Sequence, residues 1–380
     1  MRIAWLGHRS ARGADGIITY SREITAGLRE RGFEVIFFHH DRDVAGDDSI
    51  ALPALTEGHR FVIPKPGAGK RLRNLLRRHE VDLVHVSLSF SMLDFNLPGL
   101  CHELGIPIVA TFHAPFDTRF NYWGSLSQVF YRVYSQPLAR CDAVIIFGDT
   151  QRRLLARMGV PESAIRVLPN GVDIDRYCPG PSAKREQLGT GQLFTYLGRI
   201  DPEKNVDVLL SAFSKAAPAD GVRLLVVGSG SERRRLERRF RDPRILFTGP
   251  ITDEREKLEI LRATDAFFLP SSIEGLSLSM LEAMACGAAT VATDVGSDGD
   301  AVRGAGIVLE PDSLEEELVA AIRLLTEIPE LCAVLGAKAR ERAVSGFSLA
   351  RNLDRLVETY AELAAARRPA PAQGAERTPN

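Results

Sequence analysis

Short apolar runs alternate with segments of helical periodicity along most of the chain, and this alternation constrains the fold more than any other feature. In the first half the runs are RIAWLG, FEVIFFHH, VDLVHVSL, IPIVATFH and DAVIIFG; in the second half they are LFTYLGRI, VRLLVVGSG, RILFTGPI, DAFFLPSS, ATVATDVG and GIVLEP. Continuous apolar runs are typical of strands buried on both faces. Strands that alternate with helices predict parallel sheets with crossover helices, so we expect an α/β protein.

The two series of runs indicate two domains, because 380 residues are too many for one ordinary core. Residues 178–192 contain turn formers and charges without periodicity, and they predict an interdomain linker. We expect doubly wound, Rossmann-like domains at 1–178 and 190–345. A helix at 347–367 is expected to pack back on the first domain, and a disordered tail is expected at 368–380.

The composition restricts the partners and the compartment. A net charge of −1 provides no global positive field, so nucleic acid is not expected as a partner. The five cysteines are scattered and never spaced as C-x-x-C, which favours a reducing compartment over a disulfide framework or a zinc site. No run reaches the roughly 18 apolar residues of a membrane span, and the N-terminus lacks the pattern of a signal peptide. We therefore expect a soluble, cytoplasmic protein.

The stretch SSIEGLSLSMLEAMACG, residues 271–287, contains the most informative polar pattern. Glu274 precedes a turn of small residues, and Glu282 lies about one turn into the helix expected after it. Free N–H groups at a helix start favour phosphate, and carboxylates accept hydrogen bonds from sugar hydroxyls. Arg199 and Lys204, in GRIDPEKN, supply cations for a diphosphate. A site that binds both phosphate and hydroxyl groups fits a nucleotide sugar.

Four segments in this order, GRIDPEKNVDVLL, VVGSGSERRRLE, FTGPI and PSSIEGLSLSMLEAMACGAATVATDVG, resemble the retaining glycosyltransferases of family 4, which have the GT-B fold. The glycine loop before Tyr20, TFH at 111–113 and LPNGVD at 168–173 agree with this family, so the resemblance covers about residues 1–360. GLSLS departs from the more usual Gly-Phe-Gly turn, and two alanines at 288–289 stand where a proline is common. The resemblance implies two domains that face a central cleft, with the acceptor on the first and a nucleoside-diphosphate sugar on the second.

The resemblance also implies roles for individual residues. Glu274 would bind hydroxyls of the transferred sugar, Glu282 those of the ribose, and Arg199 and Lys204 the diphosphate, while His113 would face the sugar near its anomeric carbon. The implied catalytic set is Glu274, His113, Arg199 and Lys204. The implied donor-binding set is Gly16, Arg199, Lys204, Gly228, Pro250, Ile251, Glu274, Gly275, Leu276, Ser277 and Glu282.

The resemblance implies that the protein acts by positioning the substrates and stabilising the leaving group, without a covalent intermediate. The N–H groups of Leu276 and Ser277 and the backbone at Gly16 would contact the phosphates, and Pro250 and Ile251 would neighbour the base. In this family the acceptor is expected to attack the front face of the sugar, with the departing diphosphate helping to take its proton. We therefore expect a retaining hexosyltransferase that uses a UDP-sugar, without a general base, a metal or a cofactor.

The acceptor is less constrained. KRLRNLLRRH at 70–79 places Arg73 and Arg77 on a basic helix, and an aromatic segment at 116–134 contains Trp123. A solvated helix face is the usual explanation of such a run, and contact with anionic lipid headgroups is the functional one. HVSLSFSMLDFNLPGL and ATFHAPFD also resemble, more loosely, bacterial glycolipid synthases such as digalactosyldiacylglycerol synthases. This favours a membrane glycolipid acceptor and peripheral contact with the inner face of a membrane.

Other interpretations stay open. The acceptor could be soluble, such as a sugar phosphate or a natural product, or the protein could be a sugar-nucleotide epimerase or a binding module that has lost activity. Taken alone, Glu274 could be a solvated loop residue, Glu282 a carboxylate favoured by the helix dipole, and His113 a strand-end histidine. The Asp-x-Asp triplets at 41–43, 173–175 and 298–300 lie in expected loops, so they are weak metal signals.

Overall fold

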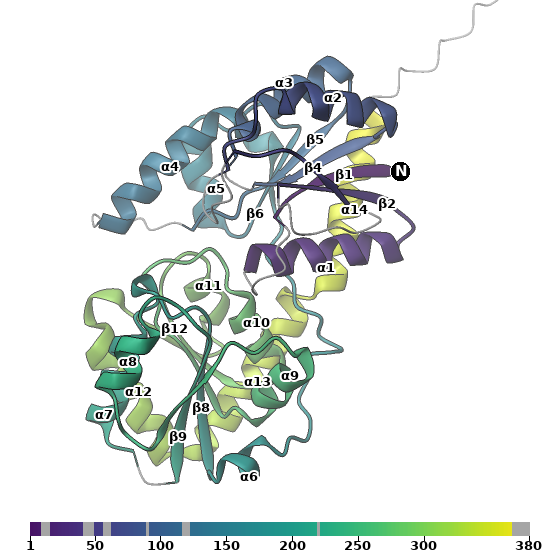
Figure 1. Ribbon diagram of the computed structural model, residues 1–380. Coiled ribbons are helices and arrows are strands. Elements are labelled where there is room, and N and C mark those ends of the chain that lie inside the picture. The colour runs from purple at the N-terminus through teal and green to yellow at the C-terminus, as the bar shows by residue number, and fades with distance from the viewer. Residues whose placement is uncertain are drawn as a thin grey trace, which may run out of the picture.

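The structure is a computed structural model, and it describes residues 1–8, 16–40, 49–55, 62–88, 91–115, 122–218 and 221–366, with the backbone alone for 122–127. The chain forms two α/β domains, each built on a parallel sheet, as the alternation of runs predicted (Figure 1). The tail expected at 368–380 and the side chain of Trp123 lie outside the described part.

In the described part of the chain, the first domain contains a seven-stranded parallel sheet in the order β3-β2-β1-β4-β5-β6-β7. Its strands are β1 (Arg2–Leu6), β2 (Glu34–His39), β3 (Ser49–Ala51), β4 (Leu83–Ser87), β5 (Ile108–Thr111), β6 (Ala143–Ile146) and β7 (Ile165–Val167). Its helices are α1 (Gly16–Glu30), α2 (Ala68–Arg78), α3 (Leu93–Leu104), α4 (Tyr122–Leu138), α5 (Asp149–Arg157) and the 3-10 helix η1 (Glu162–Ala164). The strand order reverses between β1 and β4.

The second domain, over its described residues, contains a six-stranded parallel sheet in the order β10-β9-β8-β11-β12-β13. Its strands are β8 (Gln192–Leu197), β9 (Val222–Val227), β10 (Ile245–Gly249), β11 (Ala266–Leu269), β12 (Ala289–Thr293) and β13 (Ile307–Leu309). Its helices are α6 (Lys184–Leu188), α7 (Val206–Ala216), α8 (Arg233–Arg239), α9 (Glu254–Ala263), α10 (Leu278–Ala285), α11 (Asp298–Val302), α12 (Leu314–Glu327) and α13 (Pro329–Gly346), with the 3-10 helices η2 (Pro202–Lys204) and η3 (Pro311–Ser313). Here the order reverses between β8 and β11.

The central strands are the most buried elements. Every residue of β4, β5, β11 and β12 is buried, which explains why their sequences are mostly apolar, with a few buried polar residues such as His85, and contain no charged positions facing solvent. In open parallel sheets, ligands bind beyond the carboxyl ends of the strands, close to the point where the strand order reverses. The loops after β1, β4, β5, β8 and β11 are therefore the places to look for a site.

The last helix, α14 (Leu349–Ala366), returns to the first domain as predicted (Figure 1). Leu353, Leu356 and Tyr360 of this helix are buried in the same cluster as Trp5 and other side chains of β1, α1 and β2. The contact with α1 is close, because a Cβ added at Gly27 would lie 2.3 Å from a methyl carbon of Leu353. The first domain is thus completed by the far end of the chain.

The segment expected to be a linker, 178–192, is packed against the second domain. It contains α6, whose Arg185 forms an ion pair with Asp265 at 2.5 Å, and the hydroxyl of Ser182 donates to the carbonyl of Glu259. The preceding residues bind the second domain as well, because Arg340 donates to the carbonyl oxygens of Ile174 and Tyr177. The crossing between the domains lies before Ile174.

Candidate active site

The carboxyl edges of the two sheets meet at the turn that follows β11. A Cβ added at Gly275, in this turn, would lie 3.6 Å from the carbonyl oxygen of His113, which follows β5 in the first domain. Asn170, from the crossing segment, donates its Nδ2 to the carbonyl of Leu276 at 2.7 Å. The sequence-predicted turn and His113 are therefore brought together from opposite domains.

Lys204 and Glu274 form the centre of this site. The Nζ of Lys204 lies 2.5 Å from Oε1 of Glu274, and the hydroxyl of Ser271 donates to the same oxygen at 2.8 Å. Both side chains are largely shielded, with 13% and 14% exposed. Among the described residues Oε2 of Glu274 has no hydrogen-bond partner, so one oxygen of the carboxylate is available to a ligand.

Local backbone structure holds Lys204 in place. It ends the short helix η2 after β8, and the next residue, Asn205, adopts a left-handed conformation with φ of 48°. The Nδ2 of Asn205 donates to the carbonyl of Pro270 at 2.9 Å and to the hydroxyl of Ser272 at 2.8 Å. The amide of Asn205 thus ties the loop after β8 to the loop after β11. No sequence motif points to this role, because within GRIDPEKN an asparagine after the lysine looks like an ordinary turn residue.

Arg199 does not contact Glu274 in the structure. Its guanidinium pairs with Asp201 and with Glu203, the latter at 2.9 Å, and its side chain is 47% exposed. Although burial opposes it, hydrogen bonds from Ser231 and Arg199 lower the pKa of Asp201. Ser231 follows β9, so Asp201 connects two loops at the carboxyl edge of the sheet. A diphosphate would have to attract Arg199 away from these carboxylates.

Glu282 is buried on α10 and forms an ion pair that the sequence did not predict. The Nζ of Lys257, on α9, lies 2.9 Å from Glu282 and 3.0 Å from Glu254, and it stands 5.1 Å from the ring centroid of Tyr177. Burial raises the pKa of Glu282, and the charge of Lys257 opposes this shift. Lys257 lies on α9, outside the sequence motif that contains Glu282, so the motif does not predict this ion pair.

The first domain contributes two charges to this cluster. Arg22 of α1 lies 3.6 Å from Glu254 across the domain boundary. Its neighbour Glu23 is half-buried, and burial together with the charge of Glu282 raises the pKa of Glu23 to about 7. The approach of α1 to the second domain therefore brings the carboxyl group of Glu23 close to those of Glu282 and Glu254.

His113 is held as a neutral imidazole. Its Nε2 lies 2.9 Å from the hydroxyl of Ser87, and the ring of Tyr20 packs edge-on against it at 4.6 Å between centroids. Burial lowers the pKa of His113 to about 3, with a smaller contribution from His8. At neutral pH this side chain is a hydrogen-bonding group without charge.

One backbone N–H group of the turn is already hydrogen-bonded to a side chain of the protein. The N–H of Ser277, expected to contact phosphate, donates instead to Oδ1 of Asp298 at 2.8 Å. Asp298 is fully buried, and burial followed by the charge of Glu274 raises its pKa well above the ordinary value. Within an Asp-x-Asp triplet this residue looked like a weak metal signal, whereas the structure places it behind the turn.

Two family models match the chain: glycosyltransferase family 4 over residues 14–176, and glycosyl transferases group 1 over residues 191–327. A glycogen synthase from Mycobacterium tuberculosis is 30% identical over 80% of this chain and 73% of its own length. A D-inositol 3-phosphate glycosyltransferase from Geodermatophilus obscurus is 31% identical over 93% of this chain and 86% of its own. The chain belongs to the glycosyltransferases with family 4 and group 1 domains.

Solved structures confirm the GT-B fold of this glycosyltransferase. Sucrose-phosphate synthase from Thermosynechococcus elongatus has a TM-score of 0.77 at 22% identity, with 96% of this chain and 99% of that chain covered. Anabaena Alr3699/HepE, solved in complex with UDP-glucose, has a TM-score of 0.77 at 19% identity, with 95% and 100% covered. At these identities the likeness shows the fold alone.

The other donor-binding residues predicted for the glycosyltransferase lie at the carboxyl edges of the sheets. Gly16 is the first residue of α1 and is exposed. Gly228 has φ of 138°, and a Cβ there would lie 1.8 Å from the carbonyl oxygen of Gly198, so only glycine fits. Pro250 is exposed after β10, and Ile251 packs half-buried against apolar side chains of the second domain. These positions are compatible with the predicted contacts to phosphate and base, which stay predictions.

The residues predicted to meet a membrane lie on α2, on the side of the first domain away from the second (Figure 1). Arg73 pairs with Glu103 of α3 at 2.5 Å, and Arg77 is exposed. Within the described residues, no group of three or more His, Cys, Asp or Glu side chains could hold a metal ion. A search of those same residues finds no helix both long and apolar enough to span a bilayer.

Proposed function

We propose that this glycosyltransferase transfers a hexose from a UDP-sugar to an acceptor hydroxyl with retention of configuration. The observation that carries the proposal is the Lys204–Glu274 pair, in which a cation and a carboxylate with one available oxygen lie side by side. The cation suits a departing diphosphate, and the carboxylate suits a sugar hydroxyl. The complex of the Anabaena neighbour with UDP-glucose supports the choice of donor.

The mechanism rests on positioning and charge stabilisation. Lys204 compensates the charge that develops on the leaving diphosphate, and one such contact is worth about 3 kcal/mol of barrier in comparable sites. Glu274 fixes the sugar through its free oxygen, while Ser271 and Lys204 hold the other oxygen in place. His113, kept neutral by burial, offers a hydrogen bond to the sugar without placing a second cation near the anomeric carbon. No side chain is required to form a covalent bond.

For the acceptor we propose a membrane glycolipid, reached by the first domain. Leu55, Ile63 and Met92 are 60%, 38% and 52% exposed. Backbone hydrogen bonds join their segments, because the N–H of Leu55 donates to Ile63 and that of Met92 donates to Val62. The segment of Ile63 leads into basic α2, and Met92 caps the start of α3. Exposed apolar side chains next to cations are typical of surfaces that bind membranes.

A soluble acceptor is the second candidate. Two of the proteins that this chain resembles are named for inositol phosphate and for sucrose phosphate, which supports a phosphorylated sugar or polyol. The donor chemistry is the same in both cases, so the acceptor decides between them.

The test is the release of nucleoside diphosphate from a panel of UDP-, ADP- and GDP-sugars. Each donor is combined with vesicles of a bacterial lipid extract, with sugar phosphates, or with no acceptor, and the anomeric configuration of the product is determined by NMR. Release from a UDP-sugar that rises only with lipid supports the first candidate, and a rise only with sugar phosphates supports the second. Conversion of the donor to its epimer without an acceptor, or an inverted product, would reject the proposed reaction.

A further inference from the structure

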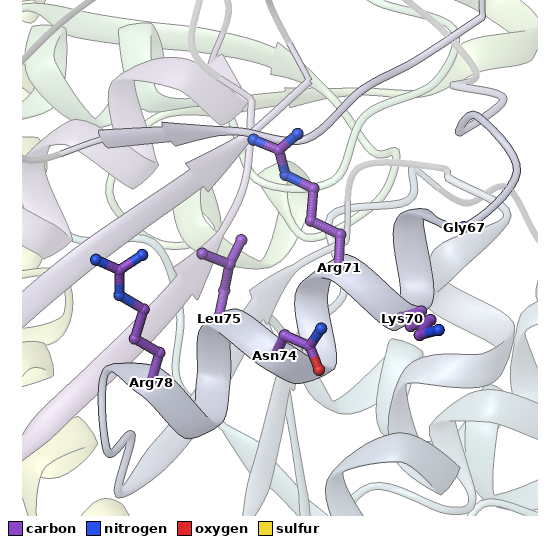
Figure 2. Close-up of a pocket in the computed structure, with 6 residues that line it drawn as sticks. All are labelled: Gly67, Lys70, Arg71, Asn74, Leu75 and Arg78. Atoms are coloured by element: carbon purple, nitrogen blue, oxygen red, sulfur yellow. The ribbon is translucent and has the colours of Figure 1, made fainter.

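One exposed face of α2 forms a cationic pocket outside the site described above. The pocket has a volume of about 370 Å³ and is lined by Gly67, Lys70, Arg71, Asn74, Leu75 and Arg78 (Figure 2). Three of these side chains are cationic and none is acidic. Figure 2 shows that Arg71, Leu75 and Arg78 point to the same side of the helix, with Lys70 and Asn74 on the adjoining side.

The cations of the pocket are not used by the protein. Among the described residues, Lys70, Arg71 and Arg78 have no ion pair or side-chain hydrogen bond, whereas Arg73 of the same helix turns to α3 and pairs with Glu103. Helix α2 contains no acidic residue at all. An unneutralised cluster of three cations costs free energy through repulsion, and a bound anion removes that cost.

The shape of the pocket indicates the kind of anion. Arg71 and Arg78 are seven residues apart, which corresponds to about 10 Å along a helix. Leu75 lies between them as an apolar floor, and Asn74 offers an amide beside it. The guanidinium group binds phosphate oxygens in a bidentate manner, and Lys70 adds a point charge. Gly67, with φ of 85°, begins α2 without a side-chain cap, so the helix N-terminus adds positive potential at one end.

We propose that this face of α2 is a binding site for phosphate groups carried on a ligand with an apolar or neutral segment. The ligand spans the two arginines, with a phosphate at one or both and the neutral segment over Leu75. The site is separate from Lys204 and Glu274, and its occupancy does not depend on the proposed transfer reaction. Two sources offer this chemistry, an anionic lipid headgroup and a soluble phosphate ester, and the experiment distinguishes them.

The experiment follows binding at residue level in the full-length protein. Inorganic pyrophosphate is titrated at low ionic strength while the backbone amide signals of Gly67 and Asn74 are recorded by ¹H–¹⁵N NMR, so that anion binding elsewhere is not counted. We expect saturable shifts, with the affinity reduced about tenfold or more in Arg71→Gln/Arg78→Gln, because two charge-assisted contacts are lost. Arg157→Gln, which removes an exposed charge from α5 of the same domain outside the pocket, is the control and should change the affinity less than about threefold.

A second arm measures co-sedimentation with phosphatidylcholine vesicles that contain or lack phosphatidylglycerol. Binding that needs phosphatidylglycerol and is lost in the double variant, but not in Arg157→Gln, identifies the source as a lipid headgroup. Saturable pyrophosphate binding without vesicle binding identifies a soluble phosphate ester. Absence of saturable shifts together with absence of vesicle binding would overturn the proposal, as would equal losses in the double variant and in Arg157→Gln. Because these side chains lie outside the core formed by Leu72 and Leu76, the variants should keep the wild-type circular dichroism spectrum.

Discussion

Replacing Glu23 by glutamine should make the protein more stable above neutral pH. Burial and the charge of Glu282 raise the pKa of Glu23 from 4.5 to about 7. As the pH rises, the unfolded chain releases this proton near pH 4.5, whereas the folded protein keeps it until about pH 7. Between these values the folded state binds more protons, so its stability falls with rising pH, and the full penalty is present above pH 7.

The size of the effect follows from the same shift. A difference of about 2.5 pKa units corresponds to at most about 3.4 kcal/mol, since one unit is worth 1.36 kcal/mol. For a chain of 380 residues that unfolds cooperatively, this amounts to a change in Tm of at most about 4 °C. Glu23→Gln should therefore melt near the wild-type temperature at pH 4.5 and up to a few degrees above it at pH 8.

The assay is thermal unfolding of the wild type and of Glu23→Gln at pH 4.5, 6 and 8 in the same buffer mixture. Glu30→Gln removes an exposed carboxylate from the same helix and corrects for the general effect of losing one charge. If the difference in Tm between Glu23→Gln and the wild type were the same at all three pH values, Glu23 would not be forced to keep its proton at the domain boundary.

Three further substitutions test separate parts of the structure. Glu274→Gln should lower kcat/KM for the donor by about 10²-fold or more with Tm little changed, because a neutral amide accepts a weaker hydrogen bond; near-wild-type turnover in a diphosphate-release assay would remove Glu274 from the site. Gly228→Ala should lower the unfolding free energy by about 1–3 kcal/mol because its Cβ would meet the carbonyl of Gly198, while Gly16→Ala, where the space is open, should change it little; equal melting of both variants would contradict this. Tyr360→Phe should cost about 1–3 kcal/mol by leaving Nδ1 of His85 without its hydroxyl partner, and a variant as stable as the wild type in urea unfolding would show that this buried contact contributes nothing.

The sheets could be predicted because their central strands are buried on both faces. Such strands must be apolar at successive positions, and a run such as AFFL at 266–269 is therefore visible without structural information. The return of α14 could also be predicted, because a long amphipathic helix after a completed domain has to cover another apolar surface. The location of Lys204 and Glu274 in one site follows from the same logic, since they lie in the loops after β8 and β11, two central strands that are neighbours in the sheet.

The rest of the site depends on contacts that no spacing reveals. Lys257 meets Glu282 only because α9 packs beside α10, and a lysine on an amphipathic helix looks like any solvated charge. Arg199 pairs with Asp201 and Glu203 because these carboxylates, two and four residues further along the chain, lie within reach of its guanidinium, and the sequence does not show which charges an arginine will meet. Asp298 supports the turn through one backbone hydrogen bond, which the sequence does not encode as a motif.

The contact between His85 and Tyr360 has a consequence for the synthesis of the protein. The two residues are 275 positions apart, and at the usual 5–20 residues per second a ribosome needs about 14–55 s to travel from one to the other. Once β7 has been made, the nascent first domain has all its strands but still lacks the helix that covers Trp5, Ile24 and Leu28. The nascent first domain would present this apolar surface to chaperones until the last turns of α14 leave the exit tunnel. A chain truncated before residue 349 would keep the same surface exposed permanently.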